Sequence, residues 1–136
     1  MKCRIILELL AILFFTGCYN REQISRLDEA EALIQNKPDS ALTILQQLKS
    51  EGSQAEQAKY ALLYSEALDK NHIKATNDSL IRRAWEYYKH HPKDLRRQCK
   101  TLYYWGKDKL RTGDKPWALR LYLKVEEKLN DTNEPY

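Results

Sequence analysis

The spacing of apolar residues constrains the fold of this chain more than any other feature. From residue 23 to residue 129, apolar side chains recur every three or four residues, which places them on one face of a helix. Only four glycines and four prolines interrupt the 136 residues, and no segment shows the sustained alternation of a half-buried strand. The chain is therefore predicted to be all-α.

Six helical stretches are expected, arranged as three pairs of neighbours. They cover about residues 23–35, 38–49, 55–70, 78–90, 94–111 and 115–129. Pro38 suits the first turn of the second stretch, where a missing N–H costs little, and Asn77 or Asp78 can cap the fourth. Such pairs bury their apolar faces against one another, so we expect a short right-handed solenoid of about three helix hairpins.

The last pair carries the most specific residue pattern. It consists of Leu102, Trp105, Gly106, Ala118 and Tyr122. These residues resemble the signature of a tetratricopeptide repeat, which implies an aromatic packing role for Tyr122. Gly106 and Ala118 are predicted to be packing residues, because two antiparallel helices cross there at close range and a larger side chain would push them apart.

The resemblance weakens toward the N-terminus. In the middle pair Ser65, Ala84 and Tyr88 take the small, small and aromatic roles, and the first pair offers only Ala30 and Ala41. The resemblance implies tetratricopeptide-like repeats over residues 23–132, with a short tail at 133–136.

The N-terminal segment has a different character. Lys2 and Arg4 precede a mostly apolar run at 5–15, and Thr-Gly-Cys then closes the run at Cys18. A transmembrane helix would need about 20 apolar residues, whereas this run is shorter and contains Glu8. A buried core helix would not explain the basic start or the small residues before the cysteine.

This order of residues resembles a bacterial lipoprotein signal peptide. The resemblance implies that residues 1–17 are removed, that Cys18 carries fatty acyl chains such as palmitate, and that residues 18–22 form a lipidated tether. The protein would then be anchored to a membrane of the cell envelope, facing outside the cytoplasm. The inner and the outer membrane are both open as destinations.

The stretch at 27–49 resembles the opening of bacterial lipoproteins or membrane-bound regulators that begin with such repeats. In the longer proteins of that group, a transmembrane helix and a cytoplasmic signalling or DNA-binding part follow the repeats. The resemblance implies a short relative or a truncated copy of a repeat-containing membrane signalling regulator.

The sequence shows no catalytic constellation, so we expect no enzyme, cofactor or metal site. His72, His90 and His91 lie in no zinc-binding motif, and His90-His91 is most simply a solvated helix end. Cys99 lies on the apolar face of its helix and is expected to be an inert thiol. Glycine-rich phosphate loops and nucleophile elbows are absent from the sequence.

One polar stripe is the candidate binding site. Lys100, Tyr103, Lys107 and Arg111 recur at spacings of three and four, which places them along one side of the fifth stretch. In tetratricopeptide-repeat proteins this side of the first helix lines the groove that holds partner peptides. A basic groove with one tyrosine would favour an extended acidic peptide. The alternative is an ordinary solvated helix face.

Two functions of different classes follow. The first is a membrane-anchored, non-catalytic scaffold for protein–protein interaction. The second is a sensor or glycan-binding accessory lipoprotein, in which aromatic residues of the second half of the chain bind a sugar. Exposed, stacked aromatics would favour the glycan, whereas buried aromatics beside an exposed Lys/Arg stripe would favour the peptide. The net charge of +4 is too mild to indicate nucleic acid, and the extracytoplasmic address weighs against binding through Arg82-Arg83 or Arg96-Arg97.

The last helix predicts an additional contact. It carries Leu121, Tyr122, Val125 and Leu129, and the residues after it are too few and too polar to cover this stripe. Because each repeat of a solenoid buries its apolar face against a neighbour, part of the stripe should stay exposed and allow self-association through the C-terminal helix.

Overall fold

The structure, a computed structural model, describes the backbone of residues 2–131 and the side chains of residues 4–6, 8 and 21–131. Its elements are α1 (Lys2–Leu33), α2 (Pro38–Gln47), α3 (Gln54–Lys70), α4 (Ser79–Tyr88), α5 (Leu95–Arg111) and α6 (Lys115–Asn130). No strand occurs among the described residues, so the all-α prediction is confirmed.

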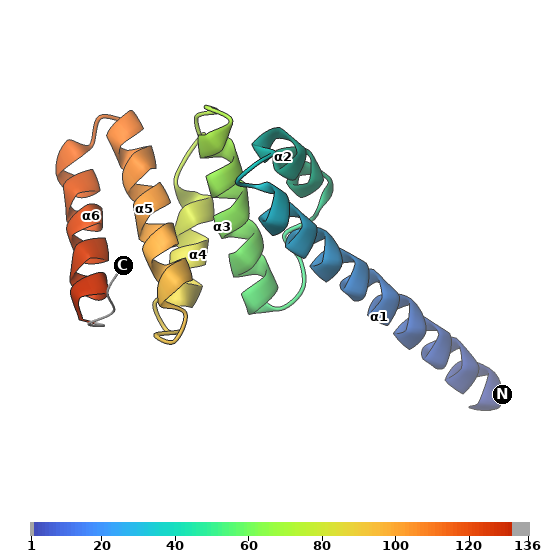
Figure 1. The fold of residues 1–136 in the computed structure, drawn as a ribbon. Coiled ribbons are helices and arrows are strands. Elements are labelled where there is room, and N and C mark those ends of the chain that lie inside the picture. The colour runs from blue at the N-terminus through green and yellow to red at the C-terminus, as the bar shows by residue number, and fades with distance from the viewer. Residues whose placement is uncertain (1, 132–136) are drawn as a thin grey trace.

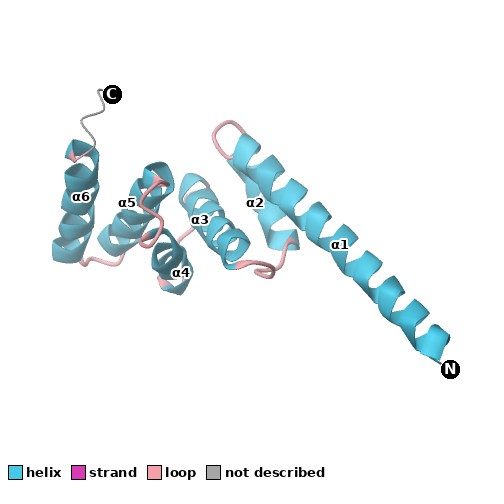
Figure 2. Cartoon of the chain, turned by 90° about the horizontal axis from the view of Figure 1, so that it is seen from below, coloured by secondary structure: helices cyan, strands magenta, loops and turns pink. Residues whose placement is uncertain are grey.

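The six helices pack as three consecutive hairpins. Each odd-numbered helix packs against the helix that follows it, and α2 and α4 also contact the first helix of the next hairpin. The first helices of neighbouring hairpins also contact each other, α1 against α3 and α3 against α5. The hairpins therefore form a row, with α1 and α6 at its two ends (Figures 1 and 2).

Local capping explains where α3 and α4 begin. Gly52 adopts a φ of +96°, and Ser53 then starts α3 with a capping box in which its hydroxyl accepts from Glu56 N–H and its own N–H donates to the Glu56 carboxylate. For α4, Asn77 rather than Asp78 supplies the side-chain oxygen, which accepts from Ser79 N–H at 2.9 Å.

The first helix differs from the prediction. Helix α1 begins at Lys2 rather than near residue 23, so residues 18–22, predicted as the tether, are helical. Gly17 is the only strong helix breaker before the end of α1, and one glycine costs only about 1 kcal/mol relative to alanine. The N-terminal half of α1 projects away from the other helices, as both Figure 1 and Figure 2 show.

Two apolar cores stabilise the row, and α3 belongs to both. The first core joins α1, α2 and α3 through Leu27, Ala30, Ile34, Ala41, Leu42, Ile44, Leu45, Leu63 and Ala67. The second core joins α3, α4 and α5 through Ala58, Ala61, Leu62, Ile81, Ala84, Tyr88 and Tyr104. Opposite sides of α3 thus serve different cores, and α3 connects the two ends of the row.

The last hairpin packs closely around its small residues. A Cβ atom placed on Gly106 would lie 2.5 Å from Cε1 of Tyr122, and Ala118 is only 1% exposed. The α6 stripe that the sequence predicts to stay open is largely covered, because Leu121 is buried and Tyr122 and Val125 are half-buried. The large apolar side chains that α6 exposes are Trp117 near its start and Leu119 and Leu123 on a stripe beside the predicted one.

Candidate functional site

Three residues of the predicted stripe on α5, Lys100, Lys107 and Arg111, belong to a polar face that the three first helices build together, and Tyr103 lies beside it. Ala30, Ser65 and Gly106 occupy the same small position of α1, α3 and α5. The residues six positions before, one position after and five positions after these three form matching sets around the face: Ile24, Lys59 and Lys100; Glu31, Glu66 and Lys107; Gln35, Lys70 and Arg111. We call these nine residues, together with Asp28 and Asp69, the first-helix face.

Glu66 is the buried centre of this face. Its side chain is 0% exposed, and its Oε1 accepts from Gln35 Nε2 at 2.8 Å and from the Tyr104 hydroxyl at 3.1 Å. The ammonium of Lys100 lies 2.5 Å from Oε2. A buried carboxylate is costly unless a cation and hydrogen bonds compensate it, and here residues from both neighbouring first helices supply them.

Asp69 holds the other two cations of the predicted stripe. Its side chain is 8% exposed and lies 2.5 Å from Lys107 Nζ, while Arg111 forms an ion pair with the second carboxylate oxygen. Arg111 also reaches the carbonyl of Ile73 in the loop before α4. Because Asp69 is fixed on α3, it fixes the two cations at the C-terminal half of α5.

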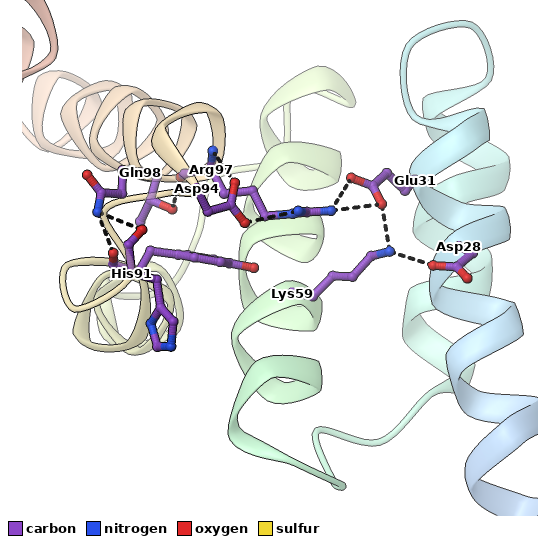
Figure 3. Close-up of polar contacts among 9 residues, drawn as sticks. Asp28, Glu31, Lys59, His91, Asp94, Arg97 and Gln98 are labelled. Carbon is purple, nitrogen blue, oxygen red and sulfur yellow. Dashed lines mark hydrogen bonds and ion pairs between the residues drawn. The ribbon is translucent and has the colours of Figure 1, made fainter. Parts of the chain in front are cut away.

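A second group of ion pairs, shown in Figure 3, joins all three first helices. Lys59 of α3 lies 2.6 Å from both Asp28 and Glu31 of α1, and Arg97 of α5 lies 3.1 Å from Glu31 and 3.0 Å from Asp94. Burial acts to raise the pKa of Glu31, but Lys59 and Arg97 outweigh it and hold that pKa below its usual value. Glu31 therefore stays ionised between two cations.

The ion pairs leave donors available. A lysine ammonium has three N–H donors and an arginine guanidinium has five, so one carboxylate contact does not exhaust either group. Lys100, Lys107 and Arg111 are each 23–33% exposed in their side chains. Tyr103 is 45% exposed, and Lys107 Nζ lies 5.7 Å from its ring centroid. The stripe is thus a set of fixed cations beside one exposed tyrosine, unlike a freely solvated helix face.

The aromatic side chains that the structure describes do not form an open stacking platform. Tyr88 and Tyr104 are buried, and Trp85 lies beneath the ammonium groups of Lys124 and Lys128, at 5.1 and 5.9 Å. The two exposed rings, Tyr103 and Trp117, pack against different partners.

The remaining reactive residues are held in ordinary environments. Cys99 is half-buried, and burial raises the pKa of its thiol. His91 stacks on the ring of Tyr87, with Nδ1 2.7 Å from the Tyr87 carbonyl oxygen. Among the described residues, no three His, Cys, Asp or Glu side chains come together as metal ligands. The side chain of Cys18 lies outside the described residues.

Sequence reasoning missed the acidic half of the face. Glu66 and Asp69 follow Leu62 at spacings of four and seven, which places both carboxylates on the buried side of α3. A carboxylate on a core-facing stripe requires a cation from the next helix. This requirement could have identified Lys100 and Lys107 from the sequence as the cations that pair with the two carboxylates.

Comparison with known proteins adds no relative. No protein-family model matches the chain, no curated protein matches its sequence, and no solved structure matches its fold. Within the described residues, no helix combines the length and the apolar character needed to cross a membrane.

Proposed function

We propose that this protein is a lipid-anchored, non-catalytic interaction scaffold that holds a partner protein at a membrane surface. Its three hairpins are tetratricopeptide-like repeats, and the first-helix face is the partner site. The partner contributes an extended segment that carries carboxylates. The anchor is Cys18, and the domain faces away from the cytoplasm.

One observation carries the proposal. Lys100, Lys107 and Arg111 are held by the buried carboxylates of Glu66 and Asp69 and still have donors to offer. Side chains held in place lose less conformational entropy when a ligand binds, so a face of this kind is preorganised for carboxylates.

The repeat assignment is supported by two features of the packing. Small residues occupy matching positions in all three hairpins, and Gly106 contacts the ring of Tyr122 as the repeat signature requires. The order of contacts, in which each hairpin packs on the first helix of the next, is also that of a helical solenoid.

Site-specific photocrosslinking in intact membranes tests the proposal. A photoreactive phenylalanine analogue replaces Lys70, a position of the first-helix face on α3, and in a second protein it replaces Gln46, which is exposed on α2. We expect a discrete crosslinked partner at Lys70 and none at Gln46. The partner should be acidic along the crosslinked segment, and added salt should weaken the crosslink because exposed charges are screened.

Lys107→Gln provides the matched test of the cations. Arg111 still neutralises Asp69 in this variant, so the fold should be kept, and the crosslink at Lys70 should weaken severalfold. Lys74→Gln removes an exposed lysine from the loop between α3 and α4 and should leave the crosslink unchanged. Equal crosslinking at Lys70 and Gln46, or a crosslink indifferent to Lys107→Gln, would contradict the assignment of the site.

A further inference from the structure

Among the described residues, the last hairpin presents an apolar face that no other helix covers. Tyr103 and Leu110 of α5 are 45% and 50% exposed, and Leu119 and Leu123 of α6 are 58% and 53% exposed. Tyr103 and Leu110 lie seven residues apart on one stripe of α5, and Leu119 and Leu123 lie four apart on α6, the last helix of the row (Figure 1). We call these four residues the terminal face.

Three of the four residues have buried counterparts in other hairpins, whereas the positions that correspond to Leu123, Gln46 and Lys89, are exposed. Leu27 and Leu62 correspond to Tyr103 and are 1% and 2% exposed, and Ile34 and Asp69 correspond to Leu110 and are 1% and 7% exposed. In α2, Leu42 corresponds to Leu119 and is 6% exposed. The residues are covered because a following hairpin packs on them. The terminal face therefore has the shape of a surface on which another pair of helices packs.

The charges beside the terminal face indicate what covers it. On α5, Arg96 precedes Tyr103 by seven residues and Leu110 by fourteen, so it lies on the same stripe. On α6, Glu126 follows Leu123 by three residues and Leu119 by seven. Both charged residues are exposed. At the edge where α5 begins and α6 ends, the face thus has a basic residue on α5 and an acidic residue on α6, whereas Lys115, four residues before Leu119, is exposed at the other end of α6.

The opposite end of the row does not complement this face. The outer side of α1 exposes Glu22, Ser25 and Glu29, which are polar or charged and would not cover four apolar side chains. A head-to-tail contact between copies is therefore disfavoured. A contact between two identical terminal faces, by contrast, buries apolar residues on both sides.

We propose that the terminal face is a homodimer interface, in which two copies pack end to end about a two-fold axis parallel to their helices. This rotation keeps the direction of every helix and places α5 of one copy opposite α6 of the other. Because α5 begins at the edge where α6 ends, Arg96 then lies in the same half of the interface as Glu126 of the second copy. Both α1 helices also leave the dimer on the same side.

Sedimentation equilibrium of the full chain in a non-ionic detergent micelle tests the proposal. We expect a closed dimer. Leu119→Lys and Leu123→Lys should each raise its dissociation constant at least about tenfold, because a charge replaces a buried leucine on both sides of the axis. Gln46→Lys is the control: Gln46 is exposed on α2, which contacts neither α5 nor α6, and its variant should dimerise normally.

Charge reversal tests the orientation. Arg96→Glu and Glu126→Arg should each weaken the dimer severalfold, and the double variant should recover most of the loss, because opposite charges face each other again. A monomer at every concentration, or association that survives both lysine variants, would overturn the interface. A double variant no better than the single ones, or assemblies that grow beyond a dimer, would overturn the two-fold arrangement.

Discussion

Glu66 shows how a single residue can connect three helices. Its carboxylate contacts Gln35, just after α1, and Tyr104 and Lys100 of α5, although it is fully buried on α3. Periodicity assigned its helix but not its partners, because helical spacing reports which side of a helix a residue occupies and not which neighbour covers that side. For the same reason, helical spacing placed Lys100 and Lys107 on one side of their helix but did not show which carboxylates they pair with.

At the same scale, Gly106 should be sensitive to any side chain. Gly106→Leu is expected to lower the free energy of unfolding by about 1–3 kcal/mol, because the added atoms overlap the ring of Tyr122. Thermal and denaturant unfolding followed by circular dichroism measure the change. Tyr122→Leu should reduce the cost of the glycine substitution in a double-mutant cycle, and strictly additive effects would show that the two residues do not touch.

The elements themselves were largely predictable, and their ends were less so. Helices α3, α5 and α6 begin and end within one residue of the limits inferred from apolar spacing. Helix α2 ends at Gln47, before the expected Lys49, because Gln23 of α1 donates to the carbonyls of Lys49 and Glu51 and so holds this segment outside the helix. A contact between residues so far apart in the chain has no local sequence signal.

The start of α3 gives a prediction for an element. Ser53→Ala removes one half of the capping box and should destabilise the protein by about 1 kcal/mol, since Glu56 N–H loses its acceptor. Hydrogen exchange should rise most at the first turn of α3. Ser25→Ala, an exposed position inside α1, is the control and should leave both measurements unchanged. Equal effects of the two substitutions would mean that the cap does not stabilise α3.

At the scale of the whole molecule, the proposed address rests on one cysteine. Cys18→Ser should abolish labelling by a fatty-acid analogue and release the protein from membranes, because a hydroxyl cannot take the place of the acylated thiol. Cys99→Ser is the control, since Cys99 lies within the helical row, and should remain labelled and membrane-bound. Labelling that persists without Cys18 would contradict the prediction, because the lipid would then be attached to another residue.

The continuity of α1 has a mechanical consequence. In a chain anchored at Cys18, the same helix that starts at the bilayer enters the first core at Leu27, and nine residues of helix span only about 14 Å. A helical stem of that length transmits orientation, whereas a coil would let the domain tumble. Partners that are themselves confined to the membrane would then meet the binding face at a restricted height and angle, which raises their effective concentration without any additional contact.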